Sequence, residues 1–341
     1  MRQYTRRNVL KLLGVGAVTV AGLGLVGCGG SGEGAGGAAS SASEPVPASQ
    51  AFAQAGVWMQ YDGDEQIGKD VEIERILAFD GNGNVTAYQC DGVTFADLNG
   101  LSDEEIIEFA KQQDKAVFEA EKQAAIDSTA EAIEAWQQCY DTLKAEADAG
   151  TYDSMNSYGA YGIEAVPEEE RAAAIEEFQT ALDNTKNSLD VANEGQAFNE
   201  AAEYQEPQPQ PYTLALETDG SGNVASGEEI RFAAPRFSFY QIEAGDTTDL
   251  ESPKTRFRVL VDYGWHNDAE IPESAFATSD EAIGLYSPNY STTQTVLDTT
   301  FGGYSGLATV VNEGHAGFTW DAPDAEGIEV DEQAAHRATP T

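Results

Sequence analysis

The sequence is poor in positive charge. It has 18 lysine and arginine residues against 59 aspartate and glutamate residues, giving a formal net charge of -41 at pH 7. A chain this acidic repels the phosphate backbone of nucleic acids and anionic membrane surfaces, so we expect no nucleic-acid partner. Hydrophobic residues still make up 41% of the chain. That share is enough for buried cores and argues against wholesale disorder.

Residues that bind metals or act as nucleophiles are also scarce. The three histidines, His266, His315 and His336, have no metal-ligand spacing to one another. Residues 303–307 approach the turn that carries the nucleophile of many hydrolases, but Leu307 stands where a second glycine belongs. No phosphate-binding glycine loop is present. We therefore predict that the protein is not an enzyme and that it carries no cofactor.

The first 27 residues have the pattern of an export leader. Residues 5–11 hold Arg6 and Arg7 followed by apolar positions and a lysine, and an apolar run over residues 12–26 leads to Cys28. The run is short for a membrane-spanning helix, although a retained anchor is the alternative. The leader resembles that of twin-arginine-exported bacterial or archaeal lipoproteins, while an ordinary secretory signal also begins with basic residues. The resemblance implies an extracytoplasmic protein whose partner is the cell membrane, through a lipid on Cys28.

Cys90 and Cys139 are the two cysteines that remain after Cys28. Outside the cytoplasm they can form one disulfide, or they can be two small buried thiols. The spacing cannot decide between these alternatives, because one cysteine lies on a predicted strand and the other on a predicted helix.

A flexible tether is predicted for residues 28–50, which are mostly Gly, Ser and Ala. The first β segment then spans residues 51–100. Residues 71–79 and 85–90 read as strands on either side of the turn 80–84, where Gly and Asn tolerate positive φ. Asp80, Asn82 and Asn84 also have the oxygen spacing of a calcium loop, but Val85 takes the place of its glycine. We favour the turn and keep calcium as a weak alternative.

Residues 101–204 have the pattern of two long helices. Ser102 and Glu105 form a capping box, and no Gly or Pro follows until Gly150. Two sets of mostly apolar residues recur at alternating steps of 3 and 4, first at Ile126, Thr129, Ile133, Trp136, Tyr140, Leu143 and Ala147, and again at Ile175, Phe178, Leu182, Thr185, Leu189, Ala192 and Gln196. These heptad seams predict an antiparallel hairpin, with a parallel coiled coil between two chains as the alternative.

The loop between the two predicted helices contains Tyr152, Tyr158 and Tyr161. Exposed aromatic side chains beside glycine would make it a binding surface. The alternative is that the tyrosines pack on the helix ends. Pro167 is predicted to open the second helix.

Residues 205–323 read as a β-rich, sandwich-like domain. The motif Asp-Gly-x-Gly-Asn-Val recurs at 80–85 and 219–224, each time between apolar strands, and predicts two hairpins in one antiparallel sheet. The number of strands, and the strand 256–263 that runs into an Asn turn, make the region faintly similar to immunoglobulin-like accessory domains of Gram-positive lipoproteins. Residues 324–341 are predicted to be an acidic, frayed tail.

The strongest candidate for a ligand contact in the sequence lies at the end of one predicted strand. Tyr263, Trp265, His266 and Asn267 combine aromatic and amide groups that suit a sugar or a peptide, or they form a plain surface turn.

The sequence as a whole predicts an α+β fold, in which a long helical hairpin is inserted into an antiparallel β platform or sandwich. The predicted function is a non-enzymatic, lipid-anchored surface protein for binding or assembly, with a protein or a glycan as the possible partner. Capture of a small molecule, cation or glycan is the alternative function.

Overall fold

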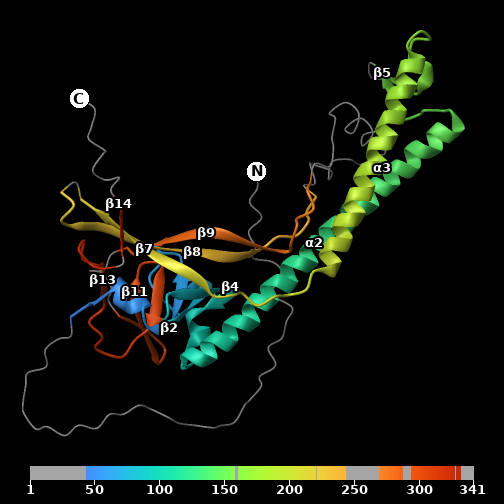
Figure 1. The fold of residues 1–341 in the computed structure, drawn as a ribbon. Coiled ribbons are helices and arrows are strands. Elements are labelled where there is room, and N and C mark those ends of the chain that lie inside the picture. Colours follow the sequence, from blue (N-terminus) through green and yellow to red (C-terminus); the bar gives the residue numbers. More distant parts are fainter. Residues whose placement is uncertain are drawn as a thin grey trace, which may run out of the picture. The chain divides into compact units, whose positions relative to one another are not determined.

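The computed structural model of the chain describes residues 44–157, 160–219, 221–242, 269–286, 293–326 and 328–331. The fold is of mixed α and β class, with a mostly antiparallel sheet and a long helix (Figure 1). The chain divides into two compact units. The sheet unit comprises residues 1–114, 207–234 and 280–341, and the helical unit comprises residues 115–206 and 235–279.

One ten-stranded sheet forms most of the sheet unit. Its main path runs in the order β10 (Gln294–Val296), β11 (Thr299–Tyr304), β12 (Leu307–Val310), β2 (Ala55–Tyr61), β3 (Glu72–Asp80), β4 (Asn84–Thr94), β7 (Gln210–Thr218), β8 (Ala225–Phe237) and β9 (Phe276–Gly284). Every neighbouring pair from β10 to β8 is antiparallel. The remaining strand, β14 (Glu329–Asp331), pairs parallel with β7.

Two β-hairpins occupy the centre of this sheet. In both turns the first aspartate accepts a hydrogen bond from the backbone N–H two residues later, at 2.7 Å for Asp80 and 3.1 Å for Asp219. The hairpins β3–β4 and β7–β8 are joined because β4 pairs with β7, with Asn84 opposite Pro211. The prediction that the repeated motif forms two hairpins of one sheet is therefore confirmed.

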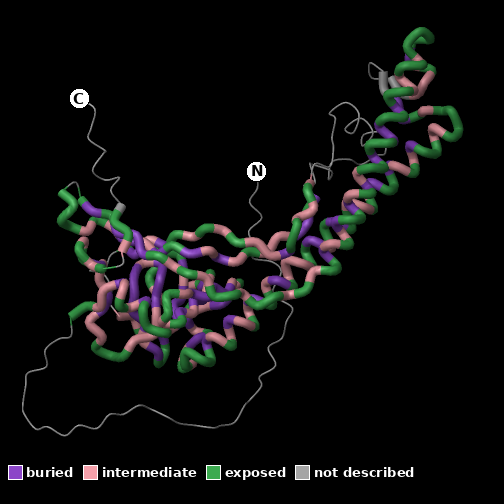
Figure 2. The backbone as a smooth tube through the Cα atoms, viewed as in Figure 1, coloured by how far each residue is buried: buried purple, intermediate pink, exposed green. Residues whose placement is uncertain are grey.

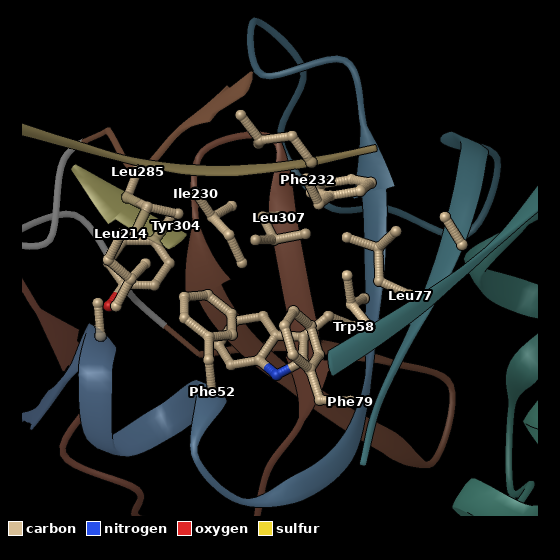
Figure 3. Packing of buried hydrophobic residues seen from close by; sticks show 14 of the residues in the cluster. Phe52, Trp58, Leu77, Phe79, Leu214, Ile230, Phe232, Leu285, Tyr304 and Leu307 are labelled. Carbon is tan, nitrogen blue, oxygen red and sulfur yellow. The ribbon is translucent and has the colours of Figure 1, made fainter. Parts of the chain in front are cut away.

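One face of the sheet packs around an aromatic cluster that α1 (Ala48–Phe52) helps to fill. Figure 3 shows Phe52 beside Trp58 and Phe79, and the Phe52 ring centroid lies 4.8 Å and 4.9 Å from theirs. Side chains from β7, β8, β11 and β12 complete the cluster. Burial of these rings provides much of the apolar area that stabilises the sheet unit.

The opposite face of β2 and β3 is buried as well. Met59 and Ile76 point to this face and pack with Phe95 of the 3-10 helix η1 (Phe95–Leu98) and with Ile106 from the first turns of α2 (Asp103–Ala149). Successive residues on a strand point to opposite faces. Strands such as β2 are therefore apolar on both sides, which explains the nearly continuous run Val57-Trp58-Met59.

The sheet curls so that its far ends approach each other. An isolated antiparallel bridge links Tyr286, just after β9, to Ser305, in the turn between β11 and β12. The main path of the described strands runs through a single sheet. The predicted sandwich of two stacked sheets is not confirmed by the described residues and stays a prediction.

The predicted tether extends too far into the chain. Residues 46–50 belong to ordered elements, because β1 (Val46–Pro47) pairs parallel with β13 (Phe318–Thr319) and Ala48 is fully buried. The predicted frayed tail is also wrong in part, since β14 pairs with β7. Both segments were wrongly predicted from their composition, because each pairs with a strand that lies far away in the sequence.

The helical unit is dominated by two helices. α2 (Asp103–Ala149) begins in the sheet unit at the predicted capping box, in which the Ser102 N–H donates to Glu105 Oε2 at 2.9 Å. It has 47 residues and is therefore about 70 Å long, and it ends before Gly150, whose φ is +68°. None of the helices within the described ranges combines the length and apolar character needed to cross a membrane.

The second helix, α3 (Arg171–Ala201), begins four residues later than Pro167. The prediction of its start is wrong because residues 168–170 form a turn, in which the Glu170 N–H donates to the Pro167 carbonyl at 2.9 Å. The loop before it contains β5 (Asn156–Ser157), β6 (Ala160–Tyr161) and the 3-10 helix η2 (Ile163–Ala165).

The predicted seams are largely buried. Buried residues recur along both helices (Figure 2). Trp136 of α2 shares a cluster with Leu189 and Ala192 of α3, and Leu143 of α2 shares another with Phe178 and Leu182. The predicted seam of α2 included Tyr140, but Tyr140 is only partly buried. The neighbouring Cys139 is buried in its place.

Candidate functional site

Most residues that the sequence suggested for function lie outside the described part of the chain. They are the export arginines Arg6 and Arg7, the lipidation residue Cys28, and the ligand candidates Tyr263, Trp265, His266 and Asn267. Their roles stay predictions.

The calcium candidate is a hairpin turn. Asp80 Oδ1 accepts hydrogen bonds from the backbone N–H groups of Asn82 at 2.7 Å and Asn84 at 3.1 Å, and Oδ2 accepts from the Asn84 side chain at 2.8 Å. The Asn84 amide is the main cause of a lowered Asp80 pKa. The carboxylate is thus used within the turn, and the predicted turn is confirmed. Within the described ranges, no three His, Cys, Asp or Glu side chains are grouped to hold a metal.

The two remaining cysteines lie in different units and are not bridged in the structure. Cys90 is on β4, where burial and the nearby Asp114 raise its thiol pKa to about 12. Cys139 is buried against α3 side chains such as Phe178. A thiol with so high a pKa is unreactive at neutral pH. The disulfide stays a prediction.

Two other candidates serve local structure. Residues 303–307 form the tight turn between β11 and β12, and the Ser305 N–H donates to the Tyr286 carbonyl at 3.2 Å. His315 accepts a hydrogen bond from the Gly317 N–H at 2.9 Å and lies against the Phe318 ring. Burial lowers the pKa of His315, so it is neutral at pH 7.

One tyrosine of the loop before α3 packs on a helix. The Tyr152 ring meets Phe178 edge to face, with ring centroids 5.2 Å apart. This contact agrees with the packing interpretation for Tyr152. The side chains of Tyr158 and Tyr161 lie outside the described residues.

A buried acid pair that sequence reasoning missed lies in the sheet unit. Glu228 on β8 and Asp321 after β13 are each only 4% exposed. The Asp321 backbone N–H donates to Glu228 Oε2 at 3.0 Å. Burial, together with the neighbouring Asp321 carboxyl group, raises the pKa of Glu228 to about 8. At neutral pH Glu228 is therefore mostly a neutral acid, which avoids two adjacent buried charges.

The acid pair holds the N-terminal helix on the sheet. Asp321 Oδ2 accepts from the Ser49 backbone N–H at 2.7 Å, and Oδ1 accepts from the Ser49 hydroxyl at 2.6 Å. Ser49 lies in the first turn of α1, where unpaired N–H groups favour a carboxylate. Tyr304 is close by, and burial followed by the two acids raises its pKa. Both carboxylate oxygens of Asp321 accept hydrogen bonds from Ser49, so the acid pair has a structural role.

The helical unit contains an open groove between α2 and α3, which we call the amide groove. It has a volume of about 570 Å³. Its lining combines small apolar side chains with amides and acids, namely Ala130, Ile133, Glu134, Gln137, Gln138, Asp141, Asn193 and Gln196. The α2 residues are spaced by three and four, so they share one face of that helix. The face includes Ile133 of the heptad seam, while Glu134, Gln137 and Asp141 on it are exposed.

The four amides of the groove turn their N–H groups toward their own helices. Gln137 donates to Asp141 at 2.9 Å and Gln138 donates to Glu134 at 3.3 Å. Asn193 donates to the Leu189 carbonyl at 2.8 Å, and Gln196 donates to Glu200 at 3.1 Å. A carboxylate or carbonyl oxygen can only accept, so these partners fix each amide with its NH₂ group toward them.

One oxygen in the groove is shielded from solvent without a partner. Gln196 Oε1 is buried and has no hydrogen-bond partner among the described residues. Leaving such an acceptor unpaired costs about 1–3 kcal/mol. The sequence does contain the Gln–Asp and Glu–Gln pairs at a spacing of four, but such pairs are common on helix surfaces. They identify a groove only when the second helix is placed beside them.

Comparisons of the chain with protein-family models, with curated proteins and with solved structures find no match. Inference about function therefore rests on the residues of this chain.

Proposed function

We propose that the chain is a lipid-anchored extracytoplasmic protein that binds or assembles with a partner and has no catalytic role. In this proposal Arg6 and Arg7 direct export, and Cys28 carries the lipid after cleavage of the leader. The residues that follow Cys28 are mostly Gly, Ser and Ala, and we propose that they act as a spacer from the membrane. The amide groove is the structural feature that supports the proposed binding role.

We further propose that α2 and α3 form an antiparallel hairpin. The shared clusters support this, because Trp136 packs with Leu189 while Leu143, farther along α2, packs with Phe178, earlier on α3. Contacts that move toward the C-terminus along α2 while they move toward the N-terminus along α3 are the pattern of antiparallel helices. With most of the seam used inside the hairpin, the exposed polar residues of the groove can contact another molecule.

The amide groove suits a partner better than it suits a reaction. Its lining combines the apolar side chains of Ala130 and Ile133 with amide and carboxylate groups, and it contains no histidine, serine or cysteine. Capture of a small molecule or glycan is the second candidate, because about 570 Å³ falls within the usual range for small-molecule sites. The open form of the groove favours a partner that spans it, since small-molecule sites bury most of their ligand.

The anchoring half of the proposal is tested by substitution in the producing cell. Cys28→Ala is expected to abolish incorporation of a clickable fatty acid and to release the chain from the membrane fraction. Arg6→Lys with Arg7→Lys is expected to retain the precursor inside the cell. Normal lipid labelling of the Cys28→Ala protein would refute the assignment of Cys28.

The binding half is tested by photocrosslinking on intact cells. A photoreactive amino acid at Gln137 is expected to give a discrete crosslinked product, whereas the same probe at exposed Val224 in the sheet unit gives none. The product at Gln137 is expected to disappear when Glu134 and Asp141 are changed to Gln and Asn. Crosslinks of equal yield at both positions, or none at Gln137, would contradict a specific binding face.

A further inference from the structure

We infer that the amide groove recognises a basic peptide segment of its partner, whose lysine or arginine side chains supply the positive charge that the groove lacks. This inference rests on the proposed binding function and adds the chemical class of the partner.

The groove offers both amide donors and amide acceptors. Each NH₂ group of Gln137, Gln138, Asn193 and Gln196 gives one N–H to its own helix, and an amide NH₂ has a second N–H. The oxygens of Gln137, Gln138 and Asn193 take no part in these bonds, whereas Gln196 Oε1 is buried. A peptide backbone carries one donor and one acceptor in each residue, so it is complementary to a row of amides.

The charge of the groove favours a basic ligand. Glu134 and Asp141 each accept one amide hydrogen bond, and a carboxylate has about four acceptor sites. The lining contains no lysine or arginine. Lys144 and Lys186, elsewhere on the two helices, each pair with an aspartate four residues later on the same helix, at 2.7 Å and 2.6 Å. Glu134 and Asp141 therefore have no cationic partner in the lining of the groove. A guanidinium or ammonium group of the ligand fits these two carboxylates.

The shape of the groove favours a peptide. Its α2 wall runs from Ala130 to Asp141, about 16 Å along the helix. An extended peptide of about five residues has this length. The aliphatic stems of lysine and arginine cover apolar surface while their charged ends reach polar groups, which matches the apolar side chains of Ala130 and Ile133 beside acids and amides. A compact cation such as a metal ion would leave these apolar side chains uncovered.

The test measures the affinity of the purified full-length chain for fluorescein-labelled nona-arginine by fluorescence anisotropy at 150 mM NaCl. The groove variant carries Glu134→Gln and Asp141→Asn. The matched control carries Glu177→Gln and Asp183→Asn on α3, and Asp183 accepts from Gln179 just as Asp141 accepts from Gln137. Both variants neutralise two helix acids, and only one changes the groove.

We expect the groove variant to bind the peptide at least about tenfold more weakly, which corresponds to losing one or two charge-assisted hydrogen bonds. The control is expected to bind within about twofold of the native chain. Equal weakening in both variants would overturn the inference, because it would mean diffuse attraction to an acidic chain. Unchanged affinity in both variants would also overturn it. Circular dichroism of each variant verifies that the helices remain intact.

A third variant tests an exposed amide of the groove. Gln137→Met keeps the length of the side chain but removes the amide oxygen, and we expect it to weaken peptide binding about fivefold. Affinity equal to that of the native chain would contradict a contact at this atom. Spermine, a flexible polyamine, is titrated in parallel as the competing source of ammonium groups. If spermine bound as tightly as nona-arginine, the assignment to a peptide would be wrong.

Failure of this inference can be told apart from failure of the proposed function. A groove-dependent crosslink on cells, combined with no peptide affinity in vitro, would keep a binding protein and reject a basic partner. Groove-dependent peptide affinity without any crosslink on cells would reject the proposed function while the chemistry of the groove stands.

Discussion

The sheet unit and the helical unit treat polar groups in opposite ways. In the sheet unit, Glu228 and Asp321 are buried and tied to Ser49, so that the acids join an N-terminal helix to a strand. In the helical unit, Gln137 and Asn193 line an open groove and turn acceptors outward. Acids in the sheet unit therefore hold two segments of the chain together, whereas we propose that the acids of the groove bind a partner.

The first prediction concerns the aromatic cluster, where the largest effect is expected. Phe52→Ala removes a fully buried ring that contacts Trp58 and Phe79. The expected loss is about 3–5 kcal/mol of unfolding free energy. Hydrogen exchange read by mass spectrometry should show faster exchange in the sheet unit. Val224→Ala, at a site 58% exposed, is the control and should change nothing. An unaltered exchange pattern in Phe52→Ala would show that α1 is dispensable.

The second prediction concerns the pH dependence of the sheet unit. Glu228 has a pKa of about 8 in the folded chain, against an ordinary value of 4.5. Between these values the folded protein holds a proton that the unfolded chain has lost, so stability falls as the pH rises. Glu228→Gln keeps an acceptor for the Asp321 N–H and should remove this fall. The expected gain at pH 9 is on the order of 5 kcal/mol.

Urea unfolding at several pH values measures this effect. Glu217→Gln, an exposed position on neighbouring β7, should keep the native pH profile. Because Asp321 and Tyr304 face Glu228, Tyr304→Phe provides a second check and should leave the fall between pH 4.5 and 8 in place. If the Glu228→Gln variant still lost stability as the pH rises, another titrating group would be the cause.

The third prediction concerns packing in the helical unit. A Cβ atom at Gly195 of α3 would lie 2.1 Å from the Tyr240 ring, which is fully buried. The main chain of Tyr240 is held by Asn199, which donates to its carbonyl and accepts from its N–H, both at 2.9 Å. Because the ring cannot withdraw, Gly195→Ala should destabilise the helical unit by about 1–3 kcal/mol.

A double-mutant cycle separates this clash from helix propensity. In a Tyr240→Ala background, Gly195→Ala should become neutral or stabilising, since alanine favours a helix by about 1 kcal/mol over glycine. The same loss in both backgrounds would mean that the Tyr240 ring is not the obstacle.

Local signals predicted much of the fold. The capping box at Ser102 and the stop at Gly150 set the limits of α2, and the repeated Asp-Gly turn gave the two hairpins. Segments that depend on distant partners were missed. Val46 reads as part of a linker until Phe318 is placed beside it, and residues 329–331 read as a tail until β7 is placed beside them.

The candidate site was harder to predict than the fold. The seam of α3 was visible because apolar residues such as Leu182 and Leu189 repeat. The amide groove shares Ile133 and Gln196 with the two seams, and its other residues read as ordinary solvated helix surface. Glu228 lies in the run Glu228-Glu229-Ile230, and alternation along β8 alone does not show that its carboxyl group meets Asp321, 93 residues away.

The fourth and smallest predicted effect is on the stability of the groove variant. Changing Glu134 to Gln and Asp141 to Asn removes the negative charge from two exposed i,i+4 contacts but keeps an acceptor oxygen in each. Such pairs contribute only about 0.2–0.5 kcal/mol each. Thermal unfolding should therefore stay close to that of the native chain. A large loss of stability would show that these acids serve cohesion, as Glu228 and Asp321 do, and would erase the contrast between the units.

The most direct measurement is hydrogen exchange of the full-length chain with and without nona-arginine at 150 mM NaCl. The account predicts added protection over residues 130–141 of α2 and around residues 193–196 of α3, with the sheet unit unchanged. Protection spread over acidic surfaces of both units, or none in the two helices, would contradict the assignment of recognition to the amide groove.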